Sequence, residues 1–299
     1  MPELPDLELY RHALGERALG RTLVGLRIAS PFLLRSVDPA PAELVGRRLE
    51  QVERLGKRLV LGFQDERFAV LHLMIAGRLR WAAPGAALPA RLGQAAFDLE
   101  EGTLVVTEAG TKRRASLYLV RGRAGLAAHD RGGLEPLACD LATFAARLAS
   151  ENHTLKRALT DPRLFSGIGN AYSDEVLHAA RLSPLTWTSR LEAPEVARLF
   201  AAVRETLTGW SERLIAEAGG RWPAKVSAFR EGMAVHGRHR LPCPACGTAV
   251  QRIVWAENEC NYCPRCQTGG KLLADRALSR LLKQDWPRTI EELERRAGS

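Results

Sequence analysis

Two cysteine pairs near the C-terminus constrain this chain more than any other feature. Each pair has the spacing Cys-x-x-Cys, and sixteen residues separate them: Cys243, Cys246, Cys263 and Cys266. Such a pair offers two thiolates from one tight turn, and four thiolates satisfy the tetrahedral coordination of Zn²⁺. We therefore predict one structural zinc site whose four protein ligands leave no position open for catalysis. Two redox dithiols are the alternative, but no thioredoxin-like βαβ pattern surrounds the pairs.

The other two cysteines, Cys139 and Cys260, lie outside this pattern, although Cys260 is close enough to Cys263 to compete as a ligand. Disulfides are rare in the reducing cytosol, where clustered cysteines more often bind metals. We expect a cytoplasmic location, because the N-terminus has no basic segment followed by an apolar one. No apolar run reaches the roughly 18 residues that span a bilayer, so no membrane association is expected.

The charge balance favours a polyanionic partner. The chain has 43 Lys and Arg residues against 34 Asp and Glu residues, a formal net charge of +9. Nucleic acid is the first candidate for a protein this basic. An arginine-rich proteome is the alternative explanation, since it would raise the charge without such a partner.

Hydrophobic patterning divides the 299 residues into a β region and a helical region. A helix is predicted directly after Pro5. Short apolar runs then predict an antiparallel sandwich or barrel, with strands at Thr22–Ile28, Leu49–Leu55, Arg58–Phe63, Phe68–Leu73, Arg78–Trp81, Ala95–Leu99, Thr103–Val106 and Ser116–Val120. A Gly- and Ala-rich connection, Arg121–Gly133, ends this region. Further helices are predicted at Leu141–Ala149, Thr154–Thr160, Asn170–Ala180 and Leu191–Ala218, with a turn-rich segment, Asp161–Gly169, between the second and third.

The N-terminus offers a candidate nucleophile. Initiator methionine is usually removed before a small residue, which would expose the secondary α-amine of Pro2. The pKa of an α-amine is about 7.7–8.0 against about 10.4 for lysine, so far more of it is unprotonated at neutral pH. Such an amine can attack an aldehyde-level carbon and form an iminium, and Glu3 beside it can move protons. Alternatively, this segment is only a polar lead into the first helix.

With both ends in view, the chain resembles the formamidopyrimidine-DNA glycosylase and endonuclease VIII family of base-excision repair enzymes. The resemblance rests on motifs that occur in the family's order and end in the cysteine quartet: Pro2–Glu8, Gly56–Leu59, His72–Leu79 and Gly167–Glu175. It implies an α+β multidomain fold with an N-terminal antiparallel β-sandwich, a helix–two-turn–helix domain and a C-terminal zinc finger. We place these domains at residues 2–133, 140–237 and 238–270, followed by an extension of unknown role at 271–299.

The resemblance also implies roles for single residues. Pro2 would attack C1′ of the damaged nucleotide, with Glu3 as proton donor and acceptor. Lys57 would bind a phosphate near the lesion, and Asn170 would bind phosphate at a helix N-terminus. Met74 would fill the gap left by the everted nucleotide, which must leave the stacked duplex to react. The alternatives are a solvated lysine for Lys57, a helix cap for Asn170 and a core residue for Met74.

Three segments depart from the family pattern. Where the family has Asp-Pro-Arg-Arg-Phe-Gly, this chain has Glu108–Ser116, so that Arg114 can take the arginine place but Ala115 cannot act as the phenylalanine wedge. Asn258 replaces the arginine of the zinc-finger hairpin, and Arg252 or Arg265 are the candidates to substitute for it. Gly220–Val235 is short for the loop that caps 8-oxoguanine, which argues against that base as the preferred substrate.

These features predict a bifunctional DNA glycosylase and AP lyase that acts as a monomer on damaged double-stranded DNA through a Schiff base at Pro2. A non-catalytic binder of damaged DNA on the same scaffold is the alternative, kept open by the lost wedge and the lost finger arginine. A zinc-ribbon transcription factor is a weaker one, because it explains neither the N-terminal sequence nor Lys57.

Overall fold

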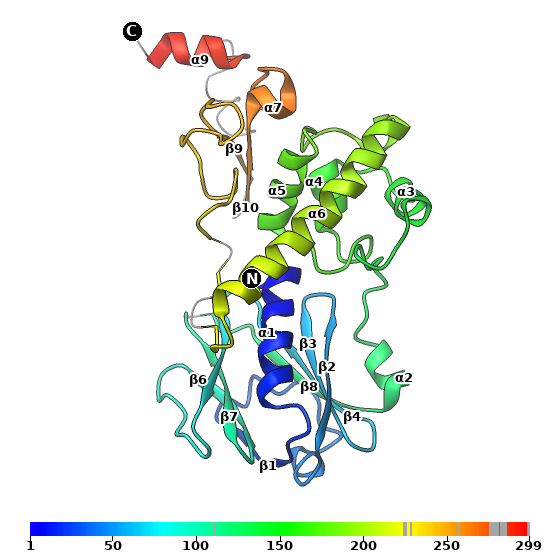
Figure 1. The fold of residues 1–299 in the computed structure, drawn as a ribbon, viewed down its shortest axis with the longest axis vertical. Coiled ribbons are helices and arrows are strands. Elements are labelled where there is room, and N and C mark those ends of the chain that lie inside the picture. Colours follow the sequence, from blue (N-terminus) through cyan, green and yellow to red (C-terminus); the bar gives the residue numbers. More distant parts are fainter. Residues whose placement is uncertain are drawn as a thin grey trace. The chain divides into compact units, whose positions relative to one another are not determined.

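The computed structural model describes residues 1–299 except positions 111, 224–225, 228, 256–257, 275–280, 282–285 and 298–299. The chain forms two units (Figure 1). Unit 1 contains Met1–Gly132 and Gly209–Ala228, and unit 2 contains Gly133–Thr208 and Phe229–Ser299. No helix within the described ranges is both long enough and apolar enough to cross a bilayer.

Unit 1 is built on two antiparallel sheets of four strands each. The first has the order β1-β6-β7-β5 and the second β2-β3-β4-β8. In chain order the strands are β1 (Leu23–Ile28), β2 (Leu49–Leu55), β3 (Arg58–Phe63), β4 (Arg67–His72), β5 (Gly77–Ala82), β6 (Gly93–Leu99), β7 (Gly102–Glu108) and β8 (Ser116–Arg121). Each predicted strand is confirmed to within about two residues, because alternating apolar residues from both sheets fill one core.

A buried helix precedes the sheets. Helix α1 (Leu4–Arg17) packs against β2 and β3, and Figure 1 shows it alongside the two sheets. Its first turn is closed by a capping box, in which the backbone N–H of Glu3 donates to the carboxylate of Asp6 at 3.0 Å. Apolar side chains cover most of its circumference, as expected for a helix enclosed by its neighbours. A short helix that the sequence did not predict, α2 (Gly122–Ala127), follows β8.

Unit 2 is mainly helical and includes a small two-stranded hairpin. Its elements are α3 (Leu141–Ala149), α4 (Leu155–Thr160), α5 (Asn170–Ala179), α6 (Ala193–Ala218, whose last turns belong to unit 1), β9 (Gln251–Trp255), β10 (Asn258–Tyr262), α7 (Pro264–Thr268) and α9 (Ile290–Ala297). The helices predicted from the sequence are confirmed, including the α4–α5 pair. Beyond the finger, the backbone of Leu272 pairs with that of Arg288, so the C-terminal segment folds back on itself.

Candidate active site and metal centre

The N-terminal amine lies in a partly buried, charged environment in unit 1. In the full chain this amine belongs to Met1, and Pro2 behind it is buried. Burial lowers the pKa of the amine from its ordinary value of 8.0, Glu3 opposes that shift, and Arg78 adds to it. Asp6 and Lys57 act on the same amine, with opposite signs. A lowered pKa leaves more of the amine unprotonated, which is the form that attacks carbon.

The acidic members of this group are buried more deeply than the sequence suggests. Glu3 is 3% exposed and Asp6 is fully buried, and both lie at the start of α1. Of the basic members, Lys57 stands at the turn between β2 and β3, whereas Arg78 is on β5. Sequence reasoning missed Arg78. Its only signal was its place directly after Gly77 within the His72–Leu79 motif.

A histidine beside these cations is held neutral. Burial, followed by the charges of Arg58 and Lys57, lowers the pKa of His72 to about 4. An imidazole with this pKa is uncharged at neutral pH and cannot add to the positive potential of the site. His72 and Lys57 both interact electrostatically with the amine, but His72 is neutral at neutral pH and Lys57 is charged.

Two loops of unit 1 carry the predicted DNA-binding residues Met74 and Arg114. Met74 lies in the turn between β4 and β5, is partly exposed, and has a positive φ of 51°. Arg114 is exposed in the loop after β7, where the buried carboxylate of Glu108 accepts the backbone N–H of Arg114 at 2.8 Å and that of Ala115 at 3.1 Å. Ala115 is 4% exposed and belongs to the sandwich core. Its side chain is therefore part of the protein interior.

Asn170 opens helix α5 in unit 2, above a buried ionic cluster. Its backbone carbonyl accepts a hydrogen bond from Lys156 Nζ at 2.7 Å, and the same ammonium pairs with Asp174 at 2.5 Å. The other carboxylate oxygen of Asp174 is bonded by His236 Nδ1 at 2.8 Å and by the backbone N–H of Asn261 at 3.1 Å. Burial would raise the pKa of Asp174, but Lys156 and His236 outweigh it and lower that pKa. This cluster fixes the N-terminal turn of α5, and sequence reasoning missed it.

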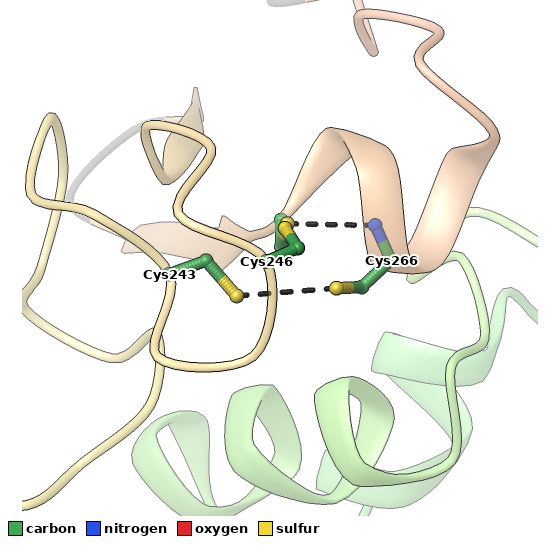
Figure 2. A group of neighbouring side chains, drawn as sticks. Cys243, Cys246 and Cys266 are labelled. Carbon is green, nitrogen blue, oxygen red and sulfur yellow. Dashed lines mark hydrogen bonds between the residues drawn. The ribbon is translucent and has the colours of Figure 1, made fainter.

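The four predicted ligand cysteines converge in unit 2. The Sγ atoms of Cys243, Cys246, Cys263 and Cys266 lie within 4.8 Å of one another. Two of the separations are 3.9 Å, between Cys243 and Cys266, and 3.4 Å, between Cys246 and Cys263. Four sulfurs bound to one tetrahedral zinc at about 2.3 Å would be about 3.8 Å apart. Figure 2 shows the Sγ atoms of Cys243 and Cys266 directed toward one another, the first from a loop and the second from α7.

The residues around the cysteine cluster show which cysteines lie outside it and which histidine contacts it. Cys139 and Cys260 are not members of the cluster, and Cys260 is buried at 1% exposure. His178 on α5 lies with its Nε2 3.3 Å from Cys243 Sγ, a contact that sequence reasoning did not predict. Burial lowers the pKa of His178, which favours a neutral ring that can donate one N–H to a thiolate. Such a bond orients a metal ligand from outside the coordination shell.

Comparison with known proteins gives consistent results over both units. Residues 1–115 match the sequence model of the formamidopyrimidine-DNA glycosylase N-terminal domain, and residues 133–212 match that of the H2TH domain of the same enzymes. Formamidopyrimidine-DNA glycosylase from Chloroflexus aggregans is 35% identical over 277 residues, covering 89% of this chain and 98% of that protein. The enzyme of that name from Variovorax paradoxus is also 35% identical, covering 89% and 100%.

A solved structure shows the same fold. The Lactococcus lactis protein in complex with DNA containing an oxidised pyrimidine superposes with a TM-score of 0.77 at 25% identity, covering 89% of this chain and 100% of that one.

Proposed function

Because the chain belongs to the formamidopyrimidine-DNA glycosylase family, we propose that it is a base-excision repair glycosylase with AP lyase activity on damaged double-stranded DNA. One observation carries the proposal: an α-amine of lowered pKa lies among two buried carboxylates and two cations. Removal of Met1 would leave the nitrogen of Pro2 in this environment, because Pro2 is itself buried beside Glu3. The amine serves as nucleophile and the carboxylates as proton carriers.

The reaction begins when the amine of Pro2 attacks C1′ of the damaged nucleotide. The N–C1′ bond forms as the glycosidic bond breaks, and the base leaves with that electron pair and takes up the proton that the amine loses. Glu3 gives the proton that opens the sugar and yields the iminium. Glu3, now ionised, accepts a C2′ proton, and the electron pair of that bond expels the 3′-phosphate and nicks the strand. Water finally releases Pro2. Each step needs a group that holds or moves a proton at the sugar, which is the role of a buried carboxylate.

The remaining site residues bind the DNA in this proposal. Lys57 and Asn170 hold phosphates, Asn170 at the N-terminus of α5, where the positive end of the helix dipole favours anions. Arg114 contacts the bases or phosphates opposite the lesion, from the loop that Glu108 fixes. The turn that contains Met74 fills the space left by the everted nucleotide. The net charge of +9 attracts the duplex independently of its sequence.

The metal of the cysteine cluster is Zn²⁺ in this proposal, held by Cys243, Cys246, Cys263 and Cys266. The separations between the sulfurs fit the ion, and its role is to stabilise the finger. Four reduced thiolates require a reducing compartment, which supports a cytoplasmic location. We retain the proposed domains at 2–133, 140–237 and 238–270, and a protein that acts as a monomer.

Borohydride trapping tests the proposed chemistry directly. A duplex with one abasic site is incubated with the protein and borohydride, and the covalent adduct is resolved by denaturing electrophoresis. Intact mass must first show that Met1 has been removed. We expect an adduct with the native chain and a large loss with Pro2→Gly, whereas Val37→Ala, an exposed residue on the same unit, should behave as the native chain. Correctly processed protein that binds the duplex in a salt-sensitive way without any adduct would show a non-catalytic binder.

A further inference from the structure

Arg54 is a buried cation that joins two parts of unit 1. It lies on β2, and its side chain is 7% exposed. Its Nε donates to the Glu8 carboxylate on α1 at 3.0 Å, and its Nη1 donates to the backbone carbonyl of Gly56, also at 3.0 Å. A planar guanidinium has donors in several fixed directions, so it can hold two acceptors at once. This side chain therefore connects the first helix to the turn that follows its own strand.

The turn that Arg54 reaches carries Lys57. Leu55 and Arg58 are paired across β2 and β3, which leaves Gly56 and Lys57 as a two-residue turn. Gly56 has a φ of 60°, a conformation that favours glycine. The carbonyl of Gly56 belongs to the peptide group that precedes Lys57. The bond from Arg54 therefore fixes the orientation of the backbone from which the Lys57 side chain extends.

The other end of the contact lies on the helix that begins at the N-terminus. Glu8 is five residues beyond Glu3, about 7.5 Å along a helix axis at about 1.5 Å per residue. The capping box closes the first turn of α1, so the N-terminus and the Glu8 carboxylate belong to one rigid element. Lys57 acts electrostatically on the N-terminal amine, which agrees with a short separation between the two. Arg54 thus links the element that carries the amine to the turn that carries this cation.

A second arginine bonds to the same carboxylate but has a different position. Arg11 Nε donates to the other oxygen of Glu8 at 2.7 Å, and its side chain is 48% exposed. That bond joins two residues of one helix, whereas the bonds of Arg54 join a helix to a turn. Because Arg54 is almost enclosed, it would influence a bound duplex through its neighbours rather than by direct contact.

We propose that Arg54 is a positioning residue, which holds the turn after β2 so that Lys57 binds the phosphate beside the lesion at a fixed distance from the amine. This inference rests on the proposed function, because it takes Lys57 as a phosphate ligand and the N-terminal amine as the nucleophile. Reacting atoms must be held about 3–3.5 Å apart, and a displacement of about 1 Å can lower the rate about a hundredfold. Lys57 supplies the charge, and Arg54 supplies the geometry.

A double-mutant cycle tests whether Arg54 acts through Lys57. The probe is a duplex that contains a stable tetrahydrofuran abasic analogue, and its Kd is measured over a series of salt concentrations. Lys57→Met should raise the Kd about tenfold, equivalent to about 1.4 kcal/mol, and reduce the salt dependence by about one phosphate contact. We expect Arg54→Met to cause about the same two changes in the native chain, but to change the Kd less than about twofold when Lys57→Met is already present.

Arg11→Met is the matched control, because it removes the other cation from the same carboxylate. Its Kd should stay within about twofold of the native value. Titration of each protein at DNA concentrations far above the Kd gives the active fraction, so misfolded protein does not enter the comparison. An effect of Arg54→Met that is equally large with and without Lys57→Met would indicate a purely structural role and overturn the proposal. Equal effects of Arg54→Met and Arg11→Met would also overturn it.

Borohydride trapping keeps this result distinct from the proposed chemistry. On a duplex abasic site at saturating protein, Arg54→Met should lower the trapping rate about tenfold, and Arg11→Met should leave it near the native rate. An unchanged rate with Arg54→Met would contradict the positioning role. A native chain that binds the analogue but forms no adduct would refute the proposed chemistry, while the Kd cycle would still decide the role of Arg54. Adduct formation together with an additive cycle would refute the positioning role alone.

Discussion

Two regions of the molecule bury ionisable groups, and they differ in how those groups are paired. In unit 2, the carboxylate of Asp174 is bonded by an ammonium, an imidazole and a backbone amide, and each partner is itself at most 5% exposed. In unit 1, the N-terminal amine is influenced by two carboxylates and two cations, and burial still lowers its pKa. A fold is destabilised when a closely paired buried charge loses its partner, whereas an amine whose protonated form is disfavoured is available for reaction.

The largest effect on the closely paired region is expected from the proposed zinc site, because the four cysteines join the segments that carry His236 and Asn261. Cys246→Ser should release the metal and unfold the finger, since a structural zinc contributes about 10–16 kcal/mol of apparent binding free energy. Metal content after dialysis and far-UV circular dichroism measure both effects. Cys139→Ser, which lies outside the cluster, should keep the metal. A Cys246→Ser protein with full metal content and unchanged unfolding would contradict the assignment.

Asp174→Asn tests the closely paired region itself. The change leaves Lys156 buried without its counter-charge, and breaking a buried ion pair costs about 3–5 kcal/mol. Because the pKa of Asp174 is lowered in the fold, its stabilisation is present above the ordinary carboxyl pKa and is lost as the pH falls through the folded-state value. Urea titrations at pH 7 and at successive pH values below 4 measure the free energy of unfolding, and the difference between the native chain and Asp174→Asn should shrink only below pH 4.

The exposed helix cap provides the control for that experiment. Asp140→Asn removes the same charge from the N-terminus of α3, where the exposed side chain accepts the Thr143 N–H at 2.8 Å. Asparagine caps helices about as well as aspartate, so this change should cost less than about 1 kcal/mol. Similar losses for both variants would mean that the buried cluster is not specially stabilising.

The distance along the chain between contacting residues explains what could be predicted from the sequence. The strands, the helix pair and the cysteine quartet depend on spacings within a few residues to a few tens of residues, so their patterns are visible in the chain. The Asp174 cluster joins residues up to 87 positions apart, and the contact of His178 with Cys243 spans 65. No periodicity records such contacts. Helix α2 was missed for a local reason, because its glycines favour a loop.

The amine site should respond to a change of charge that leaves the rest of unit 1 intact. Arg78→Gln removes a charge that lowers the pKa of the amine, so that pKa should rise. The neutral amine would then form only at higher pH, and the rate of borohydride trapping plotted against pH should move upward by roughly 0.5–1 unit, or about 0.7–1.4 kcal/mol. The Arg78 guanidinium also bonds to two carbonyls of the turn between β4 and β5. A single-stranded abasic oligonucleotide is the substrate, so that an effect of this turn on duplex DNA does not enter the measurement.

Arg80→Gln is the matched control, since it removes the same charge two residues along β5 from an exposed position. Its profile should coincide with that of the native chain. A shift of equal size in both variants would attribute the effect to net charge alone, and a downward shift with Arg78→Gln would contradict the sign of the interaction. An upward shift confined to Arg78→Gln would show that a cation beside the amine keeps it reactive at neutral pH, which separates this site from the closely paired charges of unit 2.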